Sequence, residues 1–156
     1  TENQGVFYPL QTFSKGKAVD FSEIPIGIEA ENKITENALS ILAKSISNKV
    51  QLMDSRDRRT IHLAAVFACN FTNHLFTISK SILEDRNLDF GLLEPLIIET
   101  LNKSLEIGPS NAQTGPAKRG DLETLDNHFE ALSKSPDIAE IYRSISQNII
   151  DYYSEE

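Results

Sequence analysis

RDRRTIHLAAVFACNFTNHLFTISKSILE, residues 56–84, is the stretch of the chain that decides the fold. Apolar side chains recur in it every three or four residues, the period that places them on one face of an α-helix. The residues of this stripe are Ile61, Ala64, Ala65, Ala68, Thr72, Leu75, Phe76, Ser79, Ile82 and Leu83. The spacing predicts one helix from about Arg56 to Glu84, about 45 Å long at ~1.5 Å per residue.

A second apolar flank of this helix carries Leu63, Phe67, Phe71 and Ile78. A helix that is apolar over most of its circumference is buried from two sides. One core of 156 residues is not expected to cover both sides of so long a helix. The sequence therefore predicts a homodimer that forms through the long helix.

The same helix carries polar side chains in one narrow sector. His62 and Asn70 follow at four-residue intervals through Val66, and Asn73 falls in the same sector because each residue turns the helix by about 100°. Polar groups on an otherwise apolar helix either pair with neighbouring elements or line a cavity, since burying them unpaired is costly. Both interpretations stay open: structural hydrogen bonding, or a ligand pocket.

Shorter elements are predicted on either side of the long helix. The expected strands are Gly5–Tyr8, Pro25–Ala30 and Val50–Met53, and Thr35 is expected to cap a helix within Asn32–Ser47. Three later helices are expected: one from about Leu92 to Gly108 with Pro95 in its first turn, one that starts at Asp121, and one that starts at Ser135–Pro136, with Ser110–Gly120 as a loop.

This pattern predicts a mainly α fold, a helical bundle around one long central helix, with short strands near the N-terminus. We expect residues 1–54 to be a connecting α/β segment and residues 55–156 to be a helical dimerisation and substrate-side domain. The chain does not begin with Met, and its first five residues read as an arbitrary start, so we expect a piece of a longer protein.

Composition disfavours several classes of partner. The formal net charge of −8 disfavours nucleic acid and anionic membranes, which are bound through Lys and Arg. Cys69 is the only cysteine, so neither an internal disulfide nor a thiolate metal cluster is expected. We expect no apolar run long enough to cross a bilayer and no signal segment, and therefore a cytoplasmic protein.

Three features are candidates for a site. His62 and His74 are about 18 Å apart along the helix, too far to share a metal ion, so no metal site is predicted. Arg56, Arg58 and Arg59 form either a solvated face offset by nearby acids or an anion site. The segment TGPAKRGD, residues 114–121, combines glycines, two cations and a helix start, and alone is a weak indication of an anion-binding loop.

Three separated pieces of the sequence resemble one known family in the same order. They are YPLQTFS at residues 8–14, IHLAAVFACN at residues 61–70, and TGP followed by RGD and His128 within residues 114–128. Over nearly its whole length the chain resembles the C-terminal half of the Rossmann-like oxidoreductases of domain-of-unknown-function family 2520. Three agreeing motifs are more specific than any one of them.

The resemblance implies a helical domain similar to the C-terminal domain of 6-phosphogluconate dehydrogenase. In that wider group an N-terminal Rossmann domain binds NAD(P), and the helical domain supplies substrate contacts and the dimer interface. By this likeness Asn70 faces the nicotinamide cleft and His62 lies on the same face, so both are candidate catalytic residues. The candidate substrate or cofactor contacts are Gln11, Ser14, Asn73, Thr114, Gly115, Arg119 and Asp121.

The chain departs from the family pattern at two positions. Val66 stands where β-hydroxyacid members of the wider group have a lysine, so their acid–base mechanism does not transfer. His62, one turn farther away, is the alternative proton donor if the pocket geometry permits. Tyr8 precedes Pro9 where the family usually has a histidine, which leaves the role of that side chain open.

No G-x-G-x-x-G fingerprint occurs in the chain, so a missing N-terminal Rossmann domain is expected to bind NAD(P), and this chain alone is not expected to be active. The first hypothesis is the substrate-binding and dimerisation part of an NAD(P)-dependent oxidoreductase acting on an unidentified small molecule. The alternative is a noncatalytic helical dimerisation or interaction module.

Overall fold

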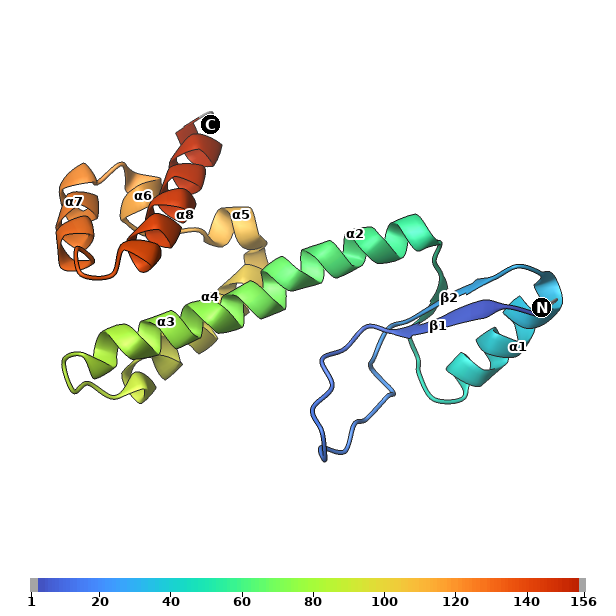
Figure 1. The fold of residues 1–156 in the computed structure, drawn as a ribbon. Helices are drawn as coiled ribbons and strands as arrows, with labels where there is room; N and C mark the ends of the chain where they lie inside the picture. Colours follow the sequence, from blue (N-terminus) through green and yellow to red (C-terminus); the bar gives the residue numbers. More distant parts are fainter. Residues whose placement is uncertain (1–2, 155–156) are drawn as a thin grey trace. The chain divides into compact units, whose positions relative to one another are not determined.

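The computed structural model describes residues 3–154, which form two compact units. The N-terminal unit extends to Asn73, and the C-terminal unit begins at His74. The division falls inside the long helix, whose backbone is continuous through it (Figure 1). Each unit is described below by itself.

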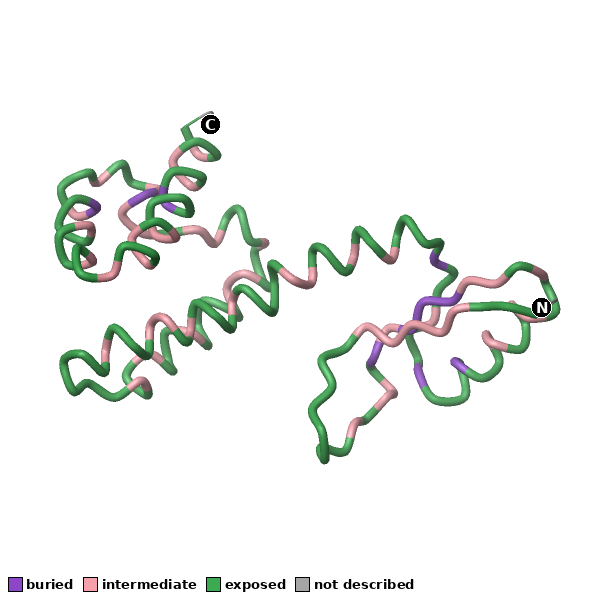
Figure 2. The backbone as a smooth tube through the Cα atoms, in the orientation of Figure 1, coloured by how far each residue is buried: buried purple, intermediate pink, exposed green. Residues whose placement is uncertain are grey.

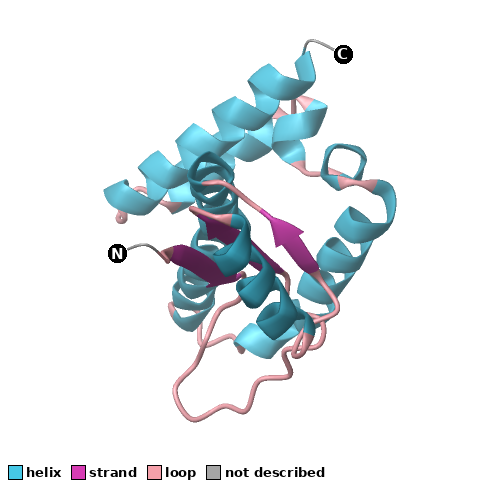
Figure 3. Ribbon diagram, turned by 90° about the vertical axis from the view of Figure 1, so that its right-hand side faces the viewer, coloured by secondary structure: helices cyan, strands magenta, loops and turns pink. Residues whose placement is uncertain are grey.

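A three-stranded sheet organises the N-terminal unit. The strands β1 (Gly5–Pro9), β2 (Ile26–Ala30) and β3 (Val50–Leu52) lie in the order β1-β2-β3. β1 pairs antiparallel to β2. Helix α1 (Lys33–Lys44) then returns the chain to the end of the sheet where β2 starts, and β3 pairs parallel to β2. Among the described residues this is the only sheet, drawn in magenta in Figure 3. A parallel pair needs such a crossover helix, so β2, α1 and β3 form a βαβ unit.

The core of this unit lies between the sheet and α1. Ile26, Ile28 and Ala43 are buried, and Phe7, Leu39 and Val50 pack against them. The two isoleucines alternate with Gly27, so they point to the same face of β2, as the two-residue period of a strand requires. Figure 2 shows much of the buried backbone of this unit along β2.

Met53 fills the opposite side of β2. A Cβ atom placed on Gly27 would lie 2.9 Å from the sulfur of Met53, so no larger residue fits there without displacing that side chain. The backbone N–H of Met53 donates to the carbonyl of Ile28 at 2.9 Å. The close approach holds the chain against the sheet directly before the long helix begins.

The long helix consists of three consecutive segments. These are α2 (Ser55–Ala65), the π-helical segment η1 (Val66–Phe71) and α3 (Thr72–Glu84). The carboxylate of Asp54 caps the start by accepting the N–H groups of Arg56 at 2.7 Å and Asp57 at 2.8 Å. The predicted helix is therefore confirmed, with its start one residue earlier and a π segment that its apolar period does not indicate.

By length and composition this helix is also able to cross a membrane. Within Ser55–Glu84 an 18-residue window has a mean hydropathy of 1.2, and none of it is buried. The expectation that no such segment exists is therefore wrong. The finding is weak evidence for a membrane span, because the core helix of a soluble protein satisfies the same criteria.

Helices make up the C-terminal unit. After α3 come the 3₁₀ segment η2 (Phe90–Leu93), α4 (Glu94–Ile107), α5 (Pro109–Ala112), α6 (Pro116–Arg119), α7 (Leu122–Ala131) and α8 (Pro136–Ser154). α4 stops at Gly108, whose φ of 86° lies in the left-handed region that favours glycine. The expected fold class, mainly α with short N-terminal strands, is confirmed.

Two local predictions are wrong. The helix within Asn32–Ser47 is capped by Asn32, whose side chain accepts the N–H of Thr35 at 2.9 Å, so Thr35 lies inside the first turn. The segment Ser110–Gly120 is not one loop, because α5 ends and α6 forms within it. Pro109 and Pro116 each start one of these short helices, which is the position where proline is tolerated best.

Candidate active site

A cavity of about 640 Å³ lies in the N-terminal unit, and we call it the polar cavity. One wall is the chain after β1, from Tyr8 to Phe13. The other wall is one face of the long helix, formed by Ile61, His62, Ala64, Ala65, Ala68, Cys69 and Asn70. Its volume falls within the range of about 300–1,000 Å³ that is typical of small-molecule sites.

Small side chains on the helix leave this space open. Ala64, Ala65 and Ala68 present only methyl groups to the cavity. Across from them, Pro9 ends β1 and turns the chain into an exposed loop, because proline has no N–H to continue a strand ladder. The alanines that the sequence pattern places in an apolar stripe therefore line a hollow in the N-terminal unit.

Three predicted site residues meet at the polar cavity: His62, Asn70 and Gln11. They supply an imidazole and two carboxamides, which can both donate and accept hydrogen bonds. The Oε1 atom of Gln11 accepts the backbone N–H of Thr12 at 2.7 Å, which orients its amide. The polar sector of the helix thus borders a cavity, although the roles of these residues stay predictions.

Two other predicted residues do not line the polar cavity. Ser14 is exposed in the loop that follows β1. Asn73 comes after the π segment, and a π turn takes in one residue more than an α turn, which shifts the following side chains by about 100°. The uniform rotation that places Asn73 in the sector of Asn70 therefore does not hold.

A neighbouring hollow of about 390 Å³, which we call the cationic pocket, lies at the start of α2. Its lining consists of Tyr8, Ser55, Arg58, Arg59, His62, Leu63 and Val66. Tyr8 and His62 line both this pocket and the polar cavity. In the sequence, Tyr8 is distinguished only by standing where the family usually has a histidine. In the structure it lines both hollows.

An ion pair fixes the start of α2 on the sheet. The guanidinium of Arg58 pairs with the carboxylate of Glu29 on β2 and donates to the carbonyl of Met53 at 3.3 Å. The Arg58 side chain is 19% exposed, so water screens this pair less than a surface pair. It therefore helps to hold His62, one helical turn later, beside the chain that follows β1.

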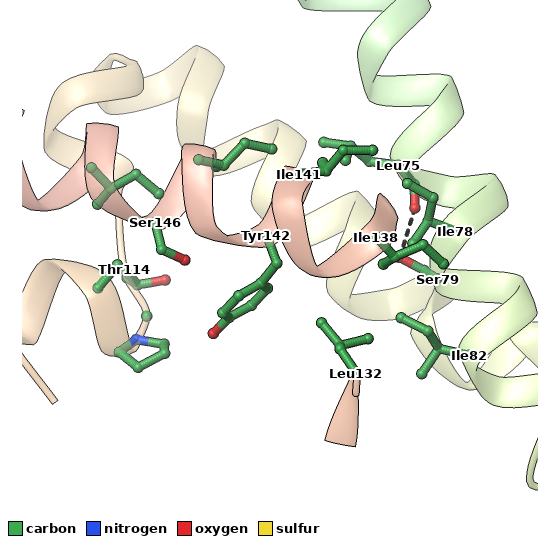
Figure 4. Close-up of a pocket in the computed structure, with 15 residues that line it drawn as sticks. Leu75, Ile78, Ser79, Ile82, Thr114, Leu132, Ile138, Ile141, Tyr142 and Ser146 are labelled. Carbon is green, nitrogen blue, oxygen red and sulfur yellow. Dashed lines mark hydrogen bonds between the residues drawn. The ribbon is translucent and has the colours of Figure 1, made fainter. Parts of the chain in front are cut away.

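The C-terminal unit has a cavity of a different kind, about 380 Å³ in volume, which we call the apolar cavity. In Figure 4, Ile138 and Ile141 of α8 lie beside Leu75 and Ile78 of α3. The predicted residues Thr114 and Gly115 line this cavity, together with Tyr142. Most of the lining is aliphatic, which suits hydrocarbon better than a polar ligand.

The remaining predicted residues stabilise the start of α7. Asp121 accepts the N–H of Thr124 at 3.1 Å and its hydroxyl at 2.8 Å, and Arg119 lies 3.7 Å from the same carboxylate. The hydrogen bonds from Thr124, and then the charge of Arg119, lower the pKa of the Asp121 carboxyl. Both residues therefore have a structural task inside the C-terminal unit.

His128 also has a structural partner. Its Nδ1 atom lies 2.7 Å from the hydroxyl of Tyr142, and the two rings meet edge to face. These contacts give His128 a structural role inside the C-terminal unit. Within residues 3–154, no group of three or more His, Cys, Asp or Glu side chains is placed to hold a metal ion.

Comparisons with solved structures identify two longer relatives. A Bacteroides fragilis protein, described as a candidate NADP oxidoreductase, is 44% identical and superposes with a TM-score of 0.91 over 96% of this chain. The Thermotoga maritima protein TM1727 is 24% identical, with a TM-score of 0.76 over 97% of this chain, and shows the fold alone. The chain spans 57% and 62% of the lengths of these two proteins.

Comparison with curated proteins gives no match. The family model described as domain of unknown function DUF2520 matches residues 24–149, which is most of the chain. The matched region includes the helix face that bears His62 and Asn70, as well as all of the apolar cavity. The chain therefore belongs to the DUF2520 family.

Proposed function

We propose that the chain is the substrate-side and dimer-forming part of a cytoplasmic NAD(P)-dependent oxidoreductase that transfers hydride to or from a small molecule. The observation that carries this proposal is the polar cavity, where His62, Asn70 and Gln11 meet beside a wall of alanines. The 44% identical relative, described as a candidate NADP oxidoreductase, supports the reaction class.

The two halves of such an enzyme divide the work. The chain contains no G-x-G-x-x-G sequence, so we propose that a region outside it binds most of the dinucleotide. The polar cavity fits the nicotinamide end, because the carboxamides of Asn70 and Gln11 can pair with an amide and the alanines leave room for a flat ring. When bound, that ring supplies or accepts the hydride.

The residues of this chain then orient the substrate and move the balancing proton. Reduction of a carbonyl or imine adds a hydride to carbon and a proton to oxygen or nitrogen. We assign the proton to an imidazole nitrogen of His62, because imidazole exchanges protons near neutral pH. Asn70, which can donate and accept at once, holds the same heteroatom in place.

The test uses the full protein that contains this chain. Quenching or enhancement of nicotinamide fluorescence measures NADPH and NADH binding, and oxidation of the bound cofactor is then followed with a panel of small carbonyl and imine compounds. His62→Gln is expected to lower the turnover of the accepted substrate about 10²- to 10⁴-fold, the usual contribution of a general acid. Absence of binding of both cofactors contradicts the proposal.

A matched control separates chemistry from folding. His74 is exposed on the same long helix and does not line the polar cavity, so His74→Gln is expected to leave turnover unchanged. Asn70→Leu tests the second residue at similar side-chain size. Equal activity of the His62 and His74 variants would remove His62 from the mechanism.

We further propose that a second copy of the chain covers the apolar flank of the long helix. In the N-terminal unit Leu63, Phe67 and Phe71 are 61%, 63% and 49% exposed, and Phe67 and Phe71 stack edge to face. From Thr60 to Ser79 the chain has no Asp, Glu, Lys or Arg, although 24% of the whole chain is charged. A two-fold contact sets a patch against itself, so a charge-free patch avoids like charges meeting.

The exposure of this flank also favours the second candidate function, a noncatalytic helical dimerisation module. In that case replacing His62 and Asn70 by residues of similar size leaves every ligand affinity unchanged. The fluorescence titrations above, repeated on the His62→Gln and Asn70→Leu variants with the accepted substrate present, distinguish the two functions.

A further inference from the structure

We propose that the cationic pocket binds an oxyanion, the carboxylate or phosphate group of the small-molecule substrate, and that Arg59 is the residue that neutralises it. The inference rests on the proposed function, since it names the substrate class of that site. Three observations support it: the residues that line the pocket, the ion pair that Arg58 forms and Arg59 does not, and the two residues that the pocket shares with the polar cavity.

The lining has the composition of an anion site. Tyr8 and Ser55 supply hydroxyl donors, His62 supplies a ring nitrogen, and Arg58 and Arg59 supply two guanidinium groups. No carboxylate lines the pocket. A guanidinium offers paired N–H groups whose spacing matches the two oxygens of a carboxylate or phosphate.

The two arginines are engaged differently. Arg58 is committed to Glu29 and to the carbonyl of Met53, so its charge is already balanced inside the protein. Arg59 is exposed and makes no ion pair or side-chain hydrogen bond with any other described residue. The Asp54 carboxylate accepts the N–H groups of Arg56 and Asp57, and the charge of Arg59 acts on it without forming an ion pair. The guanidinium of Arg59 is therefore available to a ligand.

One molecule can reach both hollows. Tyr8 and His62 line each of them, and all the residues concerned belong to the N-terminal unit. An oxyanion held by Arg59 in the cationic pocket leaves the rest of the molecule on the side of His62, where the polar cavity begins. The oxyanion then acts as the handle that sets the distance between the reacting atom and His62.

The charge of the whole chain strengthens this assignment. With a formal net charge of −8, this chain as a whole repels an anion. A small anionic substrate therefore needs a local cation outside any ion pair, and Arg59 meets this condition within the described residues.

The imidazole NMR signals of the full protein provide the test. This chain has three histidines, and His62 alone lines the cationic pocket, so His74 and His128 are internal controls; the His62→Gln variant assigns the signal. The probes are inorganic phosphate and acetate, added at constant ionic strength set with potassium chloride. We expect the His62 signals to move saturably with at least one probe, and the His74 and His128 signals to stay in place.

Arginine variants locate the binding group. Arg59→Gln is expected to weaken the binding of the active probe at least tenfold, and Arg59→Lys to recover part of the loss because it keeps the charge without the paired N–H groups. Arg56→Gln is the matched control. It removes the same charge three residues before Arg59, and the Arg56 side chain does not line the pocket. It is expected to weaken binding less than twofold.

The outcomes separate cleanly. A response to phosphate alone assigns a phosphate ester, and a response to acetate assigns a carboxylate. No response of His62 to either probe, an equal response to chloride, or equal losses for Arg56→Gln and Arg59→Gln overturns the proposal. NADPH titration of the same samples is independent of these signals, so an anion site without cofactor binding contradicts the proposed function and leaves the pocket assignment standing.

Discussion

The polar cavity and the apolar cavity are both bordered by the long helix, but the helix presents different side chains to each. To the polar cavity, in the N-terminal unit, it presents alanines interrupted by His62 and Asn70. To the apolar cavity, in the C-terminal unit, it presents Leu75, Ile78 and Ile82. The first arrangement leaves hydrogen-bonding groups beside an open space, and the second offers mostly aliphatic surface, with the Ser79 hydroxyl paired to the carbonyl of Leu75.

This difference teaches that a cavity must be judged by its lining as well as its size. Hydrocarbon walls are stabilised when another apolar surface covers them, because the hydrophobic effect does not depend on direction. Polar groups along a cavity gain only from a ligand whose donors and acceptors match theirs. This contrast underlies our proposal of chemistry at the polar cavity and of packing at the apolar surfaces.

Apart from the loss expected for His62→Gln, the largest effect is expected where the apolar flank is tested. Phe67→Glu places a carboxylate in the proposed contact and is expected to weaken dimerisation about 30-fold or more, because losing a buried aromatic anchor costs about 2 kcal/mol or more. Sedimentation velocity over a concentration series measures this change. Ser144→Glu on α8 adds the same charge at an exposed position and is the control. A wild-type protein that is monomeric at micromolar concentration contradicts the assignment of packing.

The next effect tests the emptiness of the polar cavity. Ala68→Leu fills part of it and is expected to lower kcat/KM for the accepted substrate about 10- to 100-fold, because small misplacements of reacting groups are costly. Ala131→Leu, at an exposed position in α7, adds the same atoms elsewhere. Steady-state kinetics of both variants make the comparison. Unchanged kinetics for Ala68→Leu would mean that the substrate does not use this space.

A smaller effect is expected beside the apolar cavity. Tyr142→Phe removes the hydroxyl that meets His128 and is expected to lower the free energy of unfolding by about 1 kcal/mol without changing turnover. Urea denaturation of the single variants and of the double variant with His128→Gln isolates the pair. A loss of turnover at unchanged stability would bring this part of the C-terminal unit into the chemistry.

The smallest effect concerns the start of the helix that both cavities share. The N–H groups of Asp57 and Arg56 lower the pKa of the Asp54 carboxyl. The stabilisation is therefore complete above the ordinary aspartate pKa of about 3.9 and is lost as the pH falls through the lowered value. Asp54→Asn can still accept a hydrogen bond but does not titrate, so the advantage of the wild type over this variant is expected to vanish in acid.

Urea denaturation of both proteins across the acid range measures that difference. The other carboxyl groups titrate in both proteins, so subtraction leaves the contribution of Asp54. An advantage of the wild type that persists below the lowered pKa would show that the charged cap is not its source.

The sequence predicts the elements well where one local rule decides. The apolar period gives the long helix, Asp121 gives the cap of α7, and Gly108 gives the end of α4. It fails where two rules compete. Asn32 and Thr35 are both good capping residues, and only the geometry of the turn selects Asn32.

The candidate site is predictable in the same limited sense. The four-residue interval from His62 through Val66 to Asn70 indicates a polar sector, and the polar cavity lies along it. The prediction for Asn73 assumes a uniform α-helical rotation. The π segment before this residue changes the rotation, and no apolar period in the sequence indicates a π segment. The difference between Arg58 and Arg59 depends on Glu29, a residue of β2 that is distant in the sequence, so no local pattern distinguishes the two arginines.

Met53 joins three contacts that have been described separately: its sulfur lies over Gly27, its N–H reaches Ile28, and its carbonyl accepts from Arg58. The place where the long helix leaves the sheet therefore depends on the close approach of Met53 to Gly27, whose side chain is a single hydrogen atom. A methyl group there would come within 2.9 Å of the Met53 sulfur, so the side chain that precedes the long helix would have to shift. The support of the candidate site thus includes a glycine that lines neither of its hollows.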